Sequence, residues 1–319
     1  PRVLDGLMFY LRLPLRVRRE IREFQPQAIF ASDPIVGTAA LAGRSLSGRH
    51  PAVIVEVHGD WRTFTRAYGS PARRLVARLI DKVAEHSIRR ADATRAVSTF
   101  TARLIEDVRG RPPSATFTAF SDLSAFTQHP VAPLPDRPTL LFVGSLEPYK
   151  NVEVLAGAWR LLAPSQPDAR LVLVGDGSQR AVVEKLVAEF PDRVEHHAWL
   201  DPDAVAQALD ESTLLVLPSW PEGLGRVVIE AFARGRPVVA TNGGGIPDLV
   251  TDGVEGLLVP PFDNETLAVA IGRILDDREL AERLGGGATA RFRDWDATPE
   301  ELAREMRVLV DATVAGTVR

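Results

Sequence analysis

The sequence feature that most constrains the fold is a regular alternation of apolar runs and amphipathic stretches in the second half of the chain. The segments follow one another, apolar run first, over residues 139–143, 152–162, 170–174, 179–190, 193–198, 203–209, 214–217, 226–234 and 237–241. Short apolar runs indicate buried strands, and amphipathic stretches indicate helices that cover a sheet. Strands that alternate with helices form parallel sheets, because each helix carries the chain back to the start of the next strand. We therefore expect an α/β fold with a doubly wound parallel sheet.

One connection in this pattern has an unusual composition. Residues 218–225, Pro-Ser-Trp-Pro-Glu-Gly-Leu-Gly, join the run at 214–217 to the helix expected at 226–234. A loop at the carboxyl end of a parallel strand faces the crevice in which doubly wound folds bind ligands. Gly223 and Gly225 let backbone amides approach a ligand, and the start of the next helix favours anionic or hydroxyl-rich groups. This loop is therefore the first candidate for a binding site.

Two carboxylates frame the same connection. Glu222 lies in the loop, and Glu230 lies eight residues later in the expected helix. A separation of about 10 Å suits the two ends of one extended ligand better than an acid/base pair on one bond. A structural alternative stays open, because Arg226, Glu230 and Arg234 are spaced four apart, as in an exposed ladder of ion pairs.

The wider pattern resembles the donor site of retaining glycosyltransferases with the GT-B fold, glycosyltransferase family 4. The resemblance rests on Pro-Ser, Glu-Gly-Leu-Gly, the second Glu and Gly-Arg-Pro-Val-Val-Ala at 235–240, and it is strong over 138–310 and looser before that. It implies two Rossmann-like doubly wound domains that face a cleft. We expect an N-terminal acceptor-side domain over 1–130, a C-terminal nucleotide-sugar-binding domain over 131–290, and a helix within 291–319 that crosses back. The family's first strands and glycine-rich loop have no counterpart here, so the N-terminal sheet is expected to be incomplete.

The resemblance also implies roles for residues at the ends of the expected strands. Lys150 matches the lysine that holds the donor diphosphate, whereas Ser145 stands where the family has an arginine, for which Arg226 is the candidate substitute. Glu222 and the neighbouring amides are expected to fix the hexose hydroxyls, and Glu230 to bind the ribose hydroxyls. The implied donor-binding residues are Gly144, Ser145, Lys150, Gly175, Asp176, Gly177, Glu222, Gly223, Leu224, Gly225 and Glu230.

His58 completes the expected catalytic set with Lys150 and Glu222. It follows the strand expected at 52–57, where the family has a His-Gly or His-Asp that lines the cleft beside the donor sugar. A purely structural imidazole at a strand end is the alternative.

No metal or other cofactor is expected beside the UDP- or GDP-linked donor. The ammonium group of Lys150 would stabilise the leaving diphosphate without a metal. His196 and His197 are neighbours on an expected strand and therefore point to opposite faces, which disfavours a shared ion.

Charge is distributed unevenly along the chain. Residues 1–130 carry 20 Arg or Lys against 12 Asp or Glu, while residues 131–319 carry 18 against 30. The basic half is either a solvated face or a surface for anionic membrane headgroups. A nucleic-acid partner is disfavoured, because no nucleic-acid motif or aromatic stacking platform accompanies the arginines.

Two of the helices expected in this half are rich in arginine. The first spans 2–24, places Arg12, Arg16 and Arg19 on one face, and breaks at Pro14. The second is a helical pattern over about 71–95. The chain has no cysteine, and no apolar run approaches the roughly 18 residues of a membrane span, so the cytoplasm, including the inner face of the membrane, is the simplest location.

We therefore predict a retaining, metal-independent hexosyltransferase that acts on a glycan, lipid-linked or small-molecule acceptor. Two alternatives stay open: a nucleotide-sugar-binding subunit or fragment without transfer activity of its own, and a GT-B nucleotide-sugar epimerase. A phosphorylase is disfavoured, because the sequence offers no candidate for a lysine-bound pyridoxal site.

Overall fold

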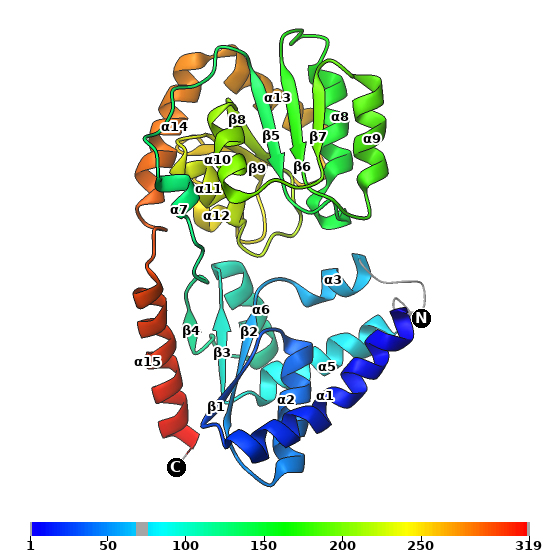
Figure 1. Cartoon of the computed structure of the whole chain (residues 1–319), viewed down its shortest axis with the longest axis vertical. Coiled ribbons are helices and arrows are strands. Elements are labelled where there is room, and N and C mark those ends of the chain that lie inside the picture. Colours follow the sequence, from blue (N-terminus) through cyan, green and yellow to red (C-terminus); the bar gives the residue numbers. More distant parts are fainter. Residues whose placement is uncertain (1, 68–75, 318–319) are drawn as a thin grey trace. The chain divides into compact units, whose positions relative to one another are not determined.

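The computed structural model describes residues 2–67 and 76–317 and divides into two compact units, each built on a parallel sheet (Figure 1). Unit 1 comprises Pro1–Phe120 and Thr298–Arg319, and unit 2 comprises Ser121–Ala297. The segments 121–130 and 291–297 thus belong to unit 2, because Phe126 is buried in its core and Phe292 packs against it.

Unit 1 holds four parallel strands in the order β1-β2-β3-β4. One face of the sheet is covered by α2, α5 and α6, which bury Val53 and Val55 of β2. The other face receives the last helix, α15, through Leu309 on Ile54. The elements are α1 (Arg2–Phe24), β1 (Ala28–Ala31), α2 (Pro34–Ser47), β2 (Ala52–Val57), α3 (Trp61–Ala67), α5 (Ala77–Arg90), β3 (Ala93–Ala96), α6 (Thr99–Arg109), β4 (Ala115–Thr116) and α15 (Pro299–Thr317).

Two expectations for unit 1 were wrong in detail. Helix α1 runs without a break through Pro14. It packs along α2, where Val17 and the Pro14 carbonyl approach Gly43 so closely that a side chain at this glycine would collide with Val17. Packing of this kind offsets the hydrogen bond that proline removes. The second basic helix ends at Arg90, because Ala93–Ala96 form β3, and the predicted residues 71–75 lie outside the described part.

Unit 2 confirms the predicted doubly wound sheet. Its six strands are all parallel, in the order β10-β9-β8-β5-β6-β7. The elements are α7 (Ser124–Thr127), β5 (Thr139–Val143), the 3-10 turn η1 (Pro148–Lys150), α8 (Val152–Leu162), β6 (Arg170–Val174), α9 (Arg180–Glu189), β7 (Val194–His197), α10 (Pro202–Asp210), β8 (Leu214–Leu217), α11 (Arg226–Ala233), β9 (Val238–Thr241), α12 (Ile246–Leu249), β10 (Gly256–Val259), α13 (Asn264–Asp276) and α14 (Arg278–Phe292).

The sheet of unit 2 is covered on both faces, as Figure 1 shows. Leu140 and Phe142 of β5 join a core with α8, α9 and α13, whereas Leu141 joins a second core with α10 and α11. From β5 the chain builds outward through β6 and β7, and it then returns to the other side of β5 for β8, β9 and β10. The strand order therefore reverses between β5 and β8, and open α/β sheets bind ligands at the carboxyl ends of the strands at that point.

Candidate functional site

An ion pair lies at the point where the strand order of unit 2 reverses. Lys150 comes from the loop after β5, and Glu222 comes from the loop after β8. The Lys150 Nζ and Glu222 Oε2 atoms lie 2.6 Å apart, and both side chains are about nine-tenths buried. The sequence placed both residues at a donor site, and the fold brings them into direct contact across 72 positions of sequence.

Backbone contacts hold these two loops together. The Trp220 amide donates to the Tyr149 carbonyl at 2.6 Å. The Asn151 side-chain amide donates to the Pro218 carbonyl at 2.9 Å. Asn151 has φ 51°, a left-handed conformation that asparagine tolerates better than most residues. The sequence analysis missed both contacts, although an asparagine directly after Lys150 was an available signal for the second.

The loop after β9 closes the site from a third side. The Gly245 amide donates to the Glu222 carbonyl at 2.8 Å. A side chain at Gly244 would place its Cβ 2.1 Å from the same carbonyl oxygen, and Gly244 also has φ 62°. Glycine is therefore required here for close approach of one backbone to another, and it does more than permit a turn.

Glu230 lies on α11 with a half-buried side chain. Within the described part of the chain its carboxylate makes no hydrogen bond, and the nearby charge is that of Arg226, one turn earlier on α11. Burial raises the pKa of Glu230 above its usual range, and the Arg226 charge only partly opposes this. A partly buried carboxylate without protein donors keeps hydrogen-bonding capacity that hydroxyl or amide groups can fill.

The exposed ion-pair ladder is excluded. Arg234 is buried, with a side chain only 2% exposed, and its guanidinium pairs with Asp210 at 2.7 Å. It also donates to the His129 carbonyl at 2.8 Å and to the Pro130 carbonyl at 2.9 Å. Arg234 therefore anchors the segment that enters unit 2 and does not pair with Glu230.

Glycine turns after β5 and β6 lie against each other beside the ion pair. The Gly144 amide donates to the Val174 carbonyl at 2.9 Å. Gly175 has φ 140°, and a Cβ there would lie 1.9 Å from the Gly144 carbonyl oxygen. His196 on β7 bonds the Gly175 carbonyl through Nε2 at 2.8 Å. The predicted residues Gly144, Ser145, Gly175, Asp176 and Gly177 are thus brought together, with Ser145 and Asp176 exposed.

One carboxylate in this region was missed by the sequence analysis. Glu147 accepts hydrogen bonds from the Ser178 hydroxyl at 2.6 Å and from the Ser178 amide at 3.2 Å. It joins the loop after β5 to the start of α9.

The two histidines of β7 have different partners, since His197 lies 2.8 Å from Glu195 while His196 bonds Gly175. This agrees with their expected orientation to opposite faces.

His58 belongs to unit 1, at the end of β2. Its side chain is 45% exposed, and its Nε2 lies 3.7 Å from the Glu56 carboxylate. Glu56 also pairs with the buried Arg95, whose guanidinium lies 4.2 Å from the Phe117 ring centroid. Burial alone would raise the pKa of Glu56, but the neighbouring His58 and the hydrogen bond and charge of Arg95 lower it below its usual range. The imidazole is therefore held beside an ionised carboxylate.

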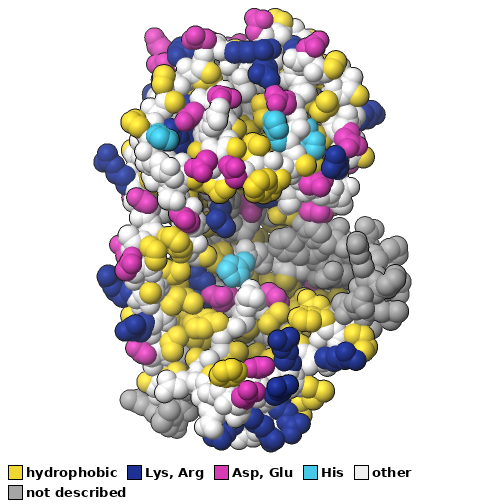
Figure 2. Space-filling view, viewed as in Figure 1, with side chains coloured by type: hydrophobic (Ala, Val, Ile, Leu, Met, Phe, Trp, Pro, Cys, Tyr) yellow, Lys and Arg dark blue, Asp and Glu magenta, His cyan; other side chains and the backbone are white. Residues whose placement is uncertain are grey.

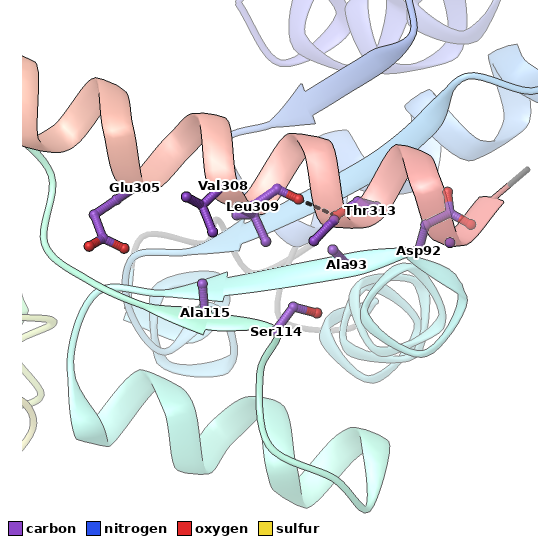
Figure 3. Close-up of a pocket in the computed structure, with 10 residues that line it drawn as sticks. Asp92, Ala93, Ser114, Ala115, Glu305, Val308, Leu309 and Thr313 are labelled. Carbon is purple, nitrogen blue, oxygen red and sulfur yellow. Dashed lines mark hydrogen bonds between the residues drawn. The ribbon is translucent and has the colours of Figure 1, made fainter.

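A groove of about 530 Å³ lies elsewhere in unit 1, between α15 and the edge formed by β3 and β4 (Figure 3). Glu305, Leu309 and Thr313 of α15 line one side, and Asp92 and Ser114 line the other. All of its lining residues belong to unit 1, whereas the Lys150–Glu222 pair belongs to unit 2.

Ion pairs neutralise part of the predicted basic surface. In the described part of the second basic helix, Asp81 pairs with Arg66 at 2.6 Å and Glu85 pairs with Arg62 at 2.9 Å. In helix α1, Arg19 pairs with Glu23 at 3.6 Å, and the exposed arginines alternate with exposed apolar side chains, including Leu11 at 65% and Leu15 at 57% exposure. Figure 2 shows basic and hydrophobic side chains interspersed over this part of unit 1. None of the helices within residues 2–67 and 76–317 is long and apolar enough to cross a membrane.

Comparison with known proteins identifies relatives for both units. The family profile described as Glycosyltransferase Family 4 matches residues 1–117, and the profile described as Glycosyl transferases group 1 matches residues 137–277. The curated alpha-D-kanosaminyltransferase of Streptomyces kanamyceticus is 37% identical over 157 residues, which are 49% of this chain and 41% of that enzyme. The chain spans about a third to two fifths of the length of the first curated relatives it matches.

Solved structures share the fold over nearly the whole chain. Sucrose-phosphate synthase from Thermosynechococcus elongatus superimposes with a TM-score of 0.77 and 25% identity, over 95% of this chain and 79% of that one. HepE of Anabaena, in complex with UDP-glucose, superimposes with a TM-score of 0.72 and 22% identity, over 96% of this chain and 81% of that one. The second similarity concerns the fold alone.

Proposed function

The chain belongs to the GT-B glycosyltransferases of group 1 and family 4, and on that premise we propose that it transfers a hexose from a nucleotide sugar to an acceptor hydroxyl. The observation that carries the proposal is the Lys150–Glu222 pair at the reversal of strand order, with the unpartnered carboxylate of Glu230 on the following helix. A cation and hydrogen-bond acceptors at this position suit an anionic, hydroxyl-rich ligand.

The donor is proposed to lie along the carboxyl ends of the strands of unit 2. Lys150 holds the diphosphate, with the glycine turns at Gly144 and Gly175–Gly177 beside it. Glu230 accepts hydrogen bonds from the ribose hydroxyls, which supply the donors that its buried carboxylate lacks in the protein. Glu222 and the amides of Gly223–Gly225 fix the hexose hydroxyls. The binding of UDP-glucose by the HepE fold relative supports a UDP-linked donor, and a GDP-linked donor is the alternative.

Transfer is proposed to retain the anomeric configuration. The bond between the anomeric carbon and the phosphate oxygen breaks, and the electron pair leaves with the nucleoside diphosphate. The acceptor oxygen bonds to the anomeric carbon on the same face, and its proton passes to the departing phosphate oxygen. Lys150 stabilises the charge that develops on the diphosphate, which is the role a metal ion has in other transferases. His58, which lies beside Glu56 at the end of β2, is also a proposed catalytic residue.

The acceptor is proposed to be met at an anionic membrane surface. This rests on α1, where Arg12, Arg16 and Arg19 accompany exposed Leu11 and Leu15. Each basic residue near an anionic surface contributes about 1 kcal/mol, and the apolar side chains add burial at the interface. A lipid-linked acceptor fits this surface better than a freely diffusing one.

A panel of nucleotide sugars tests the function. The donor is expected to raise the melting temperature, because a ligand at about 100 times its dissociation constant adds about 2.7 kcal/mol to stability. NMR of the product formed with a candidate acceptor should then show the donor's anomeric configuration. Donor binding without turnover would support a binding subunit instead, and an isomerised nucleotide sugar would support an epimerase.

A further inference from the structure

Phe262 combines two features that are each unfavourable in a folded protein. It lies in the loop after β10, with φ 63°, and its side chain is 61% exposed. A bulky residue in the left-handed region is a strained outlier, and such residues concentrate at ligand-binding sites. It directly precedes Asp263, which caps α13 by accepting from the Thr266 amide at 2.9 Å. A residue at this position often packs on the helix it precedes, but Leu267 is buried in the core while Phe262 remains in solvent.

The partner of this ring is Trp220, in the loop after β8. The two ring centroids lie 6.5 Å apart at an interplanar angle of 74°, an edge-to-face arrangement. The indole also lies over Gly243, where a Cβ would come within 1.7 Å of its Cζ3 atom. Its backbone amide is fixed to Tyr149 at 2.6 Å. Trp220 is therefore held in one position by the loops after β5, β9 and β10.

The groups at the carboxyl edge of the sheet in unit 2 fall into two parts. Lys150 and the glycine turns lie at the ends of β5 and β6, whereas Trp220 and Phe262 lie at the ends of β8 and β10. Glu222, two residues after Trp220, stands between these parts. One part suits phosphate, and the other offers aromatic surface next to a carboxylate.

We propose that Trp220 and Phe262 form a platform that contacts the apolar face of a pyranose ring. A pyranose presents C–H groups on its faces and hydroxyls around its rim, so it matches aromatic rings beside the carboxylate of Glu222. Partial burial of the two rings by the sugar removes from water apolar surface of Phe262 that Trp220 leaves exposed. This inference rests on the proposed function, and the ring is either the donor hexose or a sugar of the acceptor.

The variant Phe262→Gly tests whether the platform binds a sugar ring. Glycine adopts φ 63° without strain, which offsets the lost contact with Trp220, so the melting temperature is expected to stay within about 2–4 °C of the parent. Affinity for UDP should stay within about twofold of the parent, because the phosphate part of the site is intact. Affinity for UDP-glucose, or for maltose as an acceptor probe, should fall about tenfold. Phe262→Tyr should restore it, and Trp199→Ala, which removes a 74% exposed ring after β7, is the matched control.

The outcomes separate the sources of the ring. Weaker UDP-glucose binding with unchanged UDP binding identifies the donor hexose, and weaker maltose binding alone identifies the acceptor. Equal losses for UDP and UDP-glucose would mean stacking of the base and would overturn the proposal, as would unchanged affinity for all three ligands. If the parent protein binds none of UDP, GDP and their glucose conjugates, the proposed function fails, while maltose binding that depends on Phe262 would still support a sugar platform.

Discussion

Lys150 Nζ and Glu222 Oε2 lie 2.6 Å apart. Their loops follow β5 and β8, the two neighbouring strands between which the strand order of unit 2 reverses. The pair neutralises the lysine in the ligand-free protein. A diphosphate must therefore compete with Glu222 for the ammonium group, whereas a hexose must engage the carboxylate that the lysine releases. Donor binding in this account exchanges one buried ion pair for two ligand contacts.

Glu222→Gln should separate these two contacts. The amide leaves Lys150 with its full charge, so UDP is expected to bind more tightly, by up to about tenfold. UDP-glucose should lose this advantage, because the amide is a poorer acceptor for sugar hydroxyls. Calorimetry with both ligands measures the ratio of affinities. A parallel change for the two ligands would mean that Glu222 does not contact the sugar.

Glu230→Gln should stabilise the ligand-free protein in a pH-dependent way. Burial raises the pKa of Glu230, so the ionised carboxylate is less favourable in the folded chain than in the unfolded one. The resulting loss of stability is absent below the ordinary pKa of about 4.5. It grows as the pH rises from there to the raised pKa of the folded state, and it is complete above that pKa. The melting temperature of the variant should exceed that of the parent at pH 7, and the difference should vanish near pH 4.

The control for Glu230 is Glu189→Gln, which removes a carboxylate that is 39% exposed and paired with Arg160 at 2.8 Å. It should leave stability nearly unchanged across the same pH range, since exposed ion pairs contribute little. A Glu230→Gln variant that melts below the parent at pH 7 would show that the carboxylate already has a stabilising partner.

Arg234→Ala should destabilise unit 2 by about 3–5 kcal/mol, because it leaves Asp210 and several carbonyls without their buried donor. Arg226→Ala, on the exposed side of α11, is the matched control and should cost less than about 0.5 kcal/mol. Urea unfolding of both variants provides the comparison. Similar losses of stability in the two variants would mean that Arg234 is exposed like Arg226, and would support the ion-pair ladder.

Membrane association should depend on α1. Leu11→Asp with Leu15→Asp is expected to abolish retention on vesicles that contain anionic phospholipid, because the charges prevent burial at the interface. Val308→Asp places the same charge on α15 at a site that is 62% exposed and should leave retention unchanged. Co-sedimentation with anionic and neutral vesicles tests this. Equal retention of the parent on both kinds of vesicle would refute the membrane proposal.

Periodicity was sufficient to predict the strands and helices of unit 2 from β5 to β9, because each buried strand there is a short apolar run between amphipathic segments. It was not sufficient for tertiary partners. Arg234 has the spacing of an exposed ladder, yet it is buried against Asp210, because spacing identifies a helix face and does not identify what covers it. Pro14 likewise fails to break α1, since packing on Gly43 outweighs local propensity.

The candidate site was predictable only in part. The motif indicated Lys150, Glu222 and Glu230, because their residue types and positions match a family pattern. Contacts between distant loops, such as that of Trp220 with Phe262, carry no local signal in sequence. They arise from the strand order, which places the ends of β8 and β10 on the same side of the strand reversal.

The donor site is tested by calorimetric titration of UDP and GDP into the parent protein and into Lys150→Ala, Glu230→Ala and the exposed control Lys185→Ala. We expect one of the two nucleotides to bind the parent at one site per chain. That affinity should fall at least about tenfold in the first two variants and stay unchanged in the control. Equal affinity in all four proteins, or no binding of either nucleotide to the parent, would contradict a donor site between β5 and β8.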